Sequence, residues 1–164
     1  MGKWIGLTLG ILGALLGITV AVIAAVNPQF LASMFGLSAK ALGIQPKVEG
    51  TFSADGGTLG TWTFQPDLCV SGERQGYFGV LLTKKGDSTH FVKVAQDPTT
   101  GKAVLTVRIP GTDKTQILRS CKLLTSSVTR TNTRVNRIWS VQGTVQVDCP
   151  TAHFKGKATF ANCH

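Results

Sequence analysis

The sequence predicts an all-β domain, an antiparallel sandwich or small barrel of about seven to eight strands, preceded by a transmembrane helix and a short amphipathic helix. Three observations predict it. An apolar run covers residues 5–26, the hydrophobic period becomes two after Val48, and turn residues then recur roughly every 10 to 15 residues. No helical pattern separates those turns, so connected strands are expected to run antiparallel. The expected divisions are 1–27, 28–46 and 47–164.

The apolar run predicts a membrane span. Residues 5–26 contain no charged side chain, and at about 1.5 Å rise per residue they extend roughly 33 Å as a helix, enough to cross a bilayer. A cleaved signal peptide is the alternative, but its apolar part is normally shorter, about 7–15 residues. We therefore expect residues 1–27 to be an uncleaved signal anchor of a single-pass membrane protein.

Small residues recur along one face of this predicted helix at four-three-four spacing. They are Gly6, Gly10, Gly13 and Gly17, and Ala21 extends the row. Small side chains let helix backbones approach closely, which favours association in lipid. We expect this face to pack against a transmembrane helix of another copy or another subunit. The alternative is the ordinary enrichment of glycine in membrane helices.

Residues 28–46 form the second predicted division. Pro28 suits the first turn of a helix, and apolar residues follow at roughly helical spacing up to Leu42. A helix lying at the membrane surface is expected, with a continuation of the anchor as the alternative. Gly43 and Pro46 should end it.

The segments after Val48 alternate between polar and apolar residues, as half-buried strands do. Residues 84–87 and 97–101 are expected turns between strands, and residues 65–76 an irregular loop. Trp62 and Trp139 lie within expected strands and are predicted to belong to the core. Beyond the strand that begins near Val48, the expected strands cover residues 61–64, 79–82, 91–94, 104–109, 117–128, 139–147 and 154–160.

The four cysteines all follow the anchor and are Cys69, Cys121, Cys149 and Cys163. An even number in a small exported domain predicts disulfides and an oxidising compartment, so the C-terminal domain is expected in a periplasm or outside the cell. Three pairings are possible. If the last two strands form a hairpin, Cys149 and Cys163 lie at opposite ends and do not pair. A zinc site is the alternative, with His153 and His164 as further ligands.

Basic residues dominate one segment of the expected β domain. The chain carries a net charge of +9, and no acidic residue occurs between Asp113 and Asp148. Arg130, Arg134 and Arg137 are expected at a hairpin tip, where they would bind phosphate, acidic polysaccharide or anionic lipid headgroups. The alternative is a solvated basic edge that prevents sheet-to-sheet aggregation. Nucleic acid is not expected as a partner, because aromatic residues are few.

No motif in the sequence predicts catalysis. There is no nucleophile elbow, metalloprotease motif or phosphate-binding loop, and Asp67 and Glu73 are more typical of a solvated turn than of a catalytic pair. We therefore expect a non-catalytic protein without metal or cofactor. The predicted role is an accessory or structural subunit of a membrane assembly. The alternative is a membrane-tethered binding module for anionic ligands.

Overall fold

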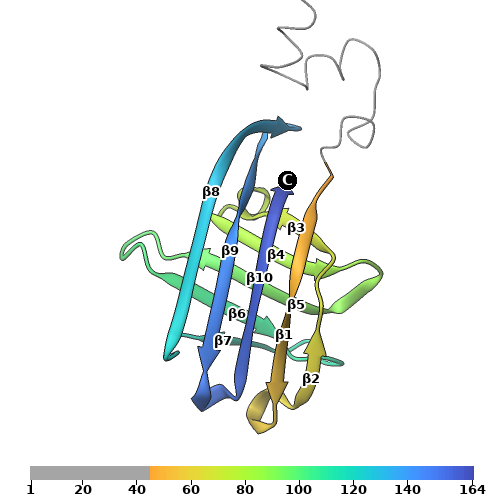
Figure 1. The fold of residues 1–164 in the computed structure, drawn as a ribbon, viewed down its shortest axis with the longest axis vertical. Coiled ribbons are helices and arrows are strands. Elements are labelled where there is room, and N and C mark those ends of the chain that lie inside the picture. The colour runs from red at the N-terminus through yellow and green to blue at the C-terminus, as the bar shows by residue number, and fades with distance from the viewer. Residues whose placement is uncertain (1–44) are drawn as a thin grey trace, which may run out of the picture. The chain divides into compact units, whose positions relative to one another are not determined.

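The structure is a computed structural model that describes residues 45–164 (Figure 1). These residues form two antiparallel sheets of five strands each. The strands are β1 (Lys47–Asp55), β2 (Thr61–Phe64), β3 (Leu68–Ser71), β4 (Gly79–Lys84), β5 (Asp87–Gln96), β6 (Ala103–Arg108), β7 (Thr115–Leu118), β8 (Leu123–Val135), β9 (Ile138–Cys149) and β10 (Phe154–Cys163). Short 3-10 turns form η1 (Gly57–Leu59), η2 (Gly72–Gln75) and η3 (Pro150–Ala152).

The strand order keeps sequence neighbours side by side. One sheet has the order β2-β1-β10-β9-β8 and the other the order β3-β4-β5-β6-β7. Within residues 45–164 the chain changes sheets twice, between β2 and β3 and between β7 and β8, and β10 returns to pair with β1. The strands of one sheet cross those of the other in Figure 1. This arrangement is a sandwich with crossed layers.

The predicted antiparallel sandwich is confirmed, but the predicted number of strands is wrong. Leu68–Ser71, expected within an irregular loop, forms β3. The segment 117–128, expected to be one strand, contains the end of β7, the crossing between sheets and the start of β8. Polar and apolar residues alternate irregularly in this segment because the chain passes from one sheet to the other. Each sheet sets its own inward-facing positions, so a single two-residue period does not continue from β7 into β8.

The core lies between the sheets and is built from alternate residues of the strands. In β10, Phe154, Ala158 and Phe160 are buried while the lysines between them are exposed. The rings of Phe52 and Phe154 stack with centroids 5.9 Å apart. Trp62 is partly buried against this core, and its indole Nε1 donates a hydrogen bond to the Leu59 carbonyl at 2.7 Å.

Two disulfides connect the cysteines. Cys69 of β3 pairs with Cys163 of β10, which joins the two sheets, and Cys121 pairs with Cys149 at the end of β9. The predicted disulfides and the separation of Cys149 from Cys163 are confirmed. The zinc alternative is wrong, because all four sulfur atoms are bonded to one another in pairs. The disulfides indicate an oxidising, extracytoplasmic compartment.

The predicted helices over residues 1–27 and 28–46 lie outside the described residues, apart from residues 45 and 46, which precede β1 and are not helical. The glycine stripe from Gly6 to Gly17 and the helix-packing role of Ala21 therefore stay predictions. In the part of the chain from residue 45 onward, no helix has the length and apolar character needed to cross a bilayer.

Candidate functional site

The predicted basic segment lies in the hairpin of β8 and β9, and its three arginines have different settings. The turn is formed by Asn136 and Arg137, both at positive φ (50° and 68°), as in the two-residue turns typical of hairpins. Arg134 pairs with Trp139 in the ladder, and Arg130 pairs with Val141 further from the turn. The register shifts between Arg130 and Arg134, so Arg130 lies in the strand rather than at the tip.

Arg134 and Arg137 are neighbours at the turn. The Arg134 Nε donates a hydrogen bond to the backbone carbonyl of Arg137 at 2.7 Å, and its guanidinium lies 5.2 Å from the centroid of the Trp139 ring. Arg134 is therefore used in shaping the hairpin. Trp139 is half-buried beneath this guanidinium and is not part of the buried core, contrary to the prediction. The Arg137 side chain is exposed.

Arg130 faces a cavity between β8 and the segment that joins β3 to β4. The cavity has a volume of about 240 Å³. Its lining comes from both sheets, so it exists only where the hairpin of β8 and β9 passes over the η2 segment. The lining residues are Ser71, Glu73, Gly76, Tyr77, Phe78, Gly79, Arg130 and Val141.

The η2 turn positions one wall of this cavity. Gly76 ends the turn in the left-handed conformation (φ 76°), which glycine adopts without steric cost. Gly72 lies against the Tyr77 ring so closely that a Cβ atom there would come within 2.3 Å of the ring. The Glu73 carboxylate accepts a hydrogen bond from the Trp139 backbone N–H at 2.9 Å, which ties this turn to the hairpin.

Two hydroxyl groups of the lining residues are buried without a hydrogen-bond partner. In the described residues, buried side-chain oxygens without a partner belong to Ser71, Tyr77 and Ser140, and the first two line the cavity. Ser71 is 1 % exposed. Burial raises the pKa of Tyr77 to about 12, so its hydroxyl stays protonated and can donate. Unpaired buried hydroxyls cost free energy, and these two oxygens lie within the cavity wall, below its accessible surface.

The charged side chains that line the cavity are Arg130 and Glu73. The exposed guanidinium of Arg130 lies 5.7 Å from the centroid of the Phe78 ring, and no ion pair to it occurs among the described residues. Tyr77, which precedes Phe78, has the Lys93 ammonium 4.0 Å from its ring centroid, but Lys93 does not line the cavity. A guanidinium held by an aromatic ring keeps its donors available for a carboxylate or phosphate.

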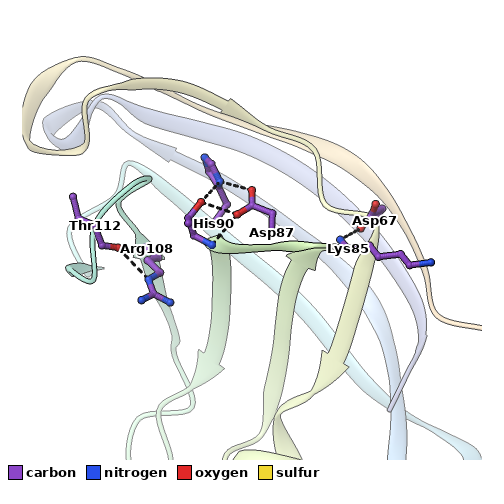
Figure 2. A network of polar contacts seen from close by, with 7 residues as sticks. Asp67, Lys85, Asp87, His90, Arg108 and Thr112 are labelled. Atoms are coloured by element: carbon purple, nitrogen blue, oxygen red, sulfur yellow. Dashed lines mark hydrogen bonds and ion pairs between the residues drawn. The ribbon is translucent and has the colours of Figure 1, made fainter.

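A second group of polar side chains lies at the hairpin of β4 and β5 (Figure 2). Asp87 accepts hydrogen bonds from the Thr89 backbone N–H at 2.7 Å and the Thr89 hydroxyl at 2.6 Å, and its other oxygen lies 2.6 Å from the His90 Nδ1. The His90 ring stacks on Phe64 of β2 with centroids 5.7 Å apart. These contacts join one sheet to the other, so we assign this group a structural role.

The Asp87 group predicts a specific acid sensitivity. Hydrogen bonds, first from the Thr89 hydroxyl and then from its N–H, with His90 contributing less, lower the pKa of Asp87 to about 2. Because the folded-state pKa is the lower one, this stabilisation is present above pH about 4 and is lost as the pH falls toward about 2. Asp87→Asn should flatten the pH dependence of urea unfolding in that window. Asp55→Asn, which removes an exposed carboxylate with no hydrogen bond or ion pair in the described domain, is the control. If the stability of Asp87→Asn depends on pH in this window as steeply as that of the unchanged protein, the assignment is wrong.

Of the two acidic residues considered in the sequence, Glu73 lines the cavity and Asp67 does not. Asp67 accepts a hydrogen bond from the Lys85 N–H at 2.7 Å (Figure 2), whereas Glu73 is bonded to the hairpin of β8 and β9, so the two carboxylates serve different segments. Ser71, Tyr77 and Phe78 were not identified from the sequence, because a serine and two aromatics beside a glycine turn carry no spacing that distinguishes a site from a loop.

No protein-family model matches this chain, and neither a curated protein nor a solved structure is significantly similar to it. The functional interpretation therefore depends on the geometry of the described domain.

Proposed function

We propose that this protein is a non-catalytic, membrane-tethered binding module that recognises a carboxylate group of an anionic ligand outside the cytoplasm. The observation that carries the proposal is the setting of Arg130. Its guanidinium has no ion-pair partner among residues 45–164 and lies at the entrance of a cavity with two unpaired buried hydroxyls. A carboxylate at this entrance would accept the bidentate donors of the guanidinium, and a change of the Ser71 rotamer would bring its hydroxyl into reach as a further donor.

Glu73 favours a carboxylate over a phosphate in this cavity. Its side chain lines the same space as Arg130, and a negative charge there repels a ligand group that carries two charges more strongly than one that carries a single charge. The Glu73 oxygens also accept hydrogen bonds from ligand N–H or O–H groups. The site therefore suits a singly charged acid with neighbouring donors, which both acidic polysaccharides and acidic polypeptides supply.

The compartment and the anchor complete the proposal. The disulfides support an exported domain, and the apolar run over residues 5–26 supports a membrane tether. A role as an accessory subunit that packs through the Gly6 to Gly17 face is compatible with a binding domain on the same chain. That role remains a prediction from the sequence.

Arg130→Gln should weaken the binding of carboxylate ligands by about tenfold or more, because it removes a charge-assisted bidentate contact. The full chain in mild detergent would be titrated with fluorescent oligogalacturonate and oligoglutamate, and anisotropy would report binding. Affinity for both should fall as the salt concentration rises.

Arg137→Gln is the matched control, because it removes the same charge from an exposed position at the hairpin turn. It should change affinity by less than about threefold, as expected of a distant surface charge. Equal losses in the two variants would show a diffuse charge effect, and undiminished binding in Arg130→Gln would place the ligand elsewhere. Tighter binding of inorganic phosphate or of vesicles rich in phosphatidylglycerol than of either carboxylate would contradict the assigned ligand class.

A further inference from the structure

β8 forms an open edge of its sheet beside the cavity. It is the outermost strand in the order β2-β1-β10-β9-β8, and in the described domain its backbone ladder pairs only with β9. Figure 1 shows it along one side of the sandwich. The residues from Thr125 to Ser127 are exposed, as are Thr129 and Arg130. The outward-facing N–H and C=O groups of β8 are therefore available to an extended backbone.

Two cavities follow this edge. A cavity of about 170 Å³ is lined by Ser126, Ser127 and Val128 together with residues of β5 and Phe78, and the cavity of Arg130 shares Phe78 in its lining. Ser126, Val128 and Arg130 are alternate residues, so they lie on one face of β8. An added strand would place its own alternate side chains along this face at a spacing of about 7 Å.

We propose that an extended acidic segment of a partner protein adds to β8 as an additional strand and places one carboxylate against Arg130. This inference rests on the carboxylate site proposed above and names the source of the carboxylate. The unpaired backbone groups of β8 favour a polypeptide over a polysaccharide, because they match the N–H and C=O groups of a peptide in both number and spacing.

Charge selects the partner among the possible occupants of this edge. No acidic residue occurs between Asp113 and Asp148, so β8 with Arg130 and Arg134 is purely basic. A second copy that pairs through its own β8 would place this basic strand against itself, and residues 1–44 contain no Asp or Glu. Neither can supply the carboxylate. An acidic strand from another protein complements the charge and is steered toward the site by it.

The side chains required of the partner strand follow from the register. The position facing Arg130 should be Glu or Asp. The next residue on the same face should be small or apolar, because it meets Val128 and the Phe78 ring. The intervening residues face away from these cavities, so they are free to vary.

The test uses synthetic peptides of about eight residues, a usual strand length, in which Val and Thr alternate around one central Glu. Fluorescence anisotropy with the full chain in mild detergent measures affinity. Two N-methylated versions carry the methyl groups on alternate residues, either on the Glu and its same-face neighbours or on the residues between them. Only one set of N–H groups faces β8, so one version should lose binding by tenfold or more while the other retains it.

A second measurement locates the peptide. Hydrogen exchange of the segment 123–130 should slow when the unmethylated peptide is bound, because its outward amides become paired. Replacing the central Glu with Gln, or Arg130 with Gln in the protein, should each weaken binding, and the double change should cost little more than either alone.

The outcomes separate this inference from the proposed function. If both N-methylated peptides bind like the parent, or if oligogalacturonate binds through Arg130 while no peptide does, strand addition is wrong and the carboxylate site stands. If no ligand depends on Arg130, both proposals fail. A stable dimer with slowed exchange of segment 123–130 in the absence of peptide would show that a second copy occupies the edge, which would also overturn the inference.

Discussion

Replacing Cys69 and Cys163 with Ala should lower the free energy of unfolding of the β domain by about 4.7 kcal/mol, because the disulfide restricts the unfolded chain over a long loop. The two cysteines are 94 residues apart, whereas Cys121 and Cys149 are 28 residues apart. Removing the shorter crosslink should therefore cost less, about 3.6 kcal/mol. Urea unfolding of the full chain in mild detergent, followed by tryptophan fluorescence, would measure both.

The order of these two effects is the informative result. The two double Cys→Ala variants are matched in composition, so each serves as the control for the other. A larger loss from the Cys121 and Cys149 variant would mean that strain or residual structure, rather than loop length, determines the effect.

The longer crosslink also bears on the candidate site. Cys69 precedes Ser71 by two residues in β3, and its disulfide holds this short strand against β10 of the other sheet. The η2 segment follows directly. Loss of the crosslink should therefore weaken ligand binding more than its effect on the folded fraction explains, because β3 would no longer position Ser71 opposite Arg130.

Gly143→Ala should destabilise the domain by about 3 kcal/mol or more. Gly143 lies in the middle of β9 at φ 157°, where an ideal Cβ atom would come within 1.7 Å of the Ser127 carbonyl oxygen in β8. A backbone atom of a paired strand cannot move aside as a flexible side chain can, so the strands must separate. A lower urea concentration at the midpoint of unfolding would show a loss of stability, provided that the free energy of unfolding depends on urea concentration as steeply as in the unchanged protein.

Gly86→Ala is the matched control for this substitution. Gly86 also has a positive φ, 77°, but a Cβ atom there would meet nothing within 4 Å. Its cost should be limited to the left-handed backbone, about 1 kcal/mol. Similar losses at Gly86 and Gly143 would contradict the explanation by close strand approach.

The fold was largely predictable from the sequence where each strand has one buried face. The alternation in residues 139–147 and 154–160 corresponds to β9 and β10, and the turns at 84–87 and 97–101 separate β4 from β5 and β5 from β6. β3 was not predicted, because four residues that include a cysteine and a serine produce little periodic signal. The disulfides were expected from the cysteine count, but their pairing depends on which strands cross between sheets.

By itself, the sequence determined the class of the domain, the oxidising compartment and the basic character of the segment around Arg130, because these depend on composition and local periodicity. Only the tertiary structure decided that Arg134 packs on Trp139, that Arg130 lines one cavity with Ser71 and Tyr77, and that β8 is an open edge of the described domain. The physical reason is distance along the chain. The cavity joins segments that are separated by about half of the described domain, and contacts of that kind are set by how the sheets cross, which no local pattern records.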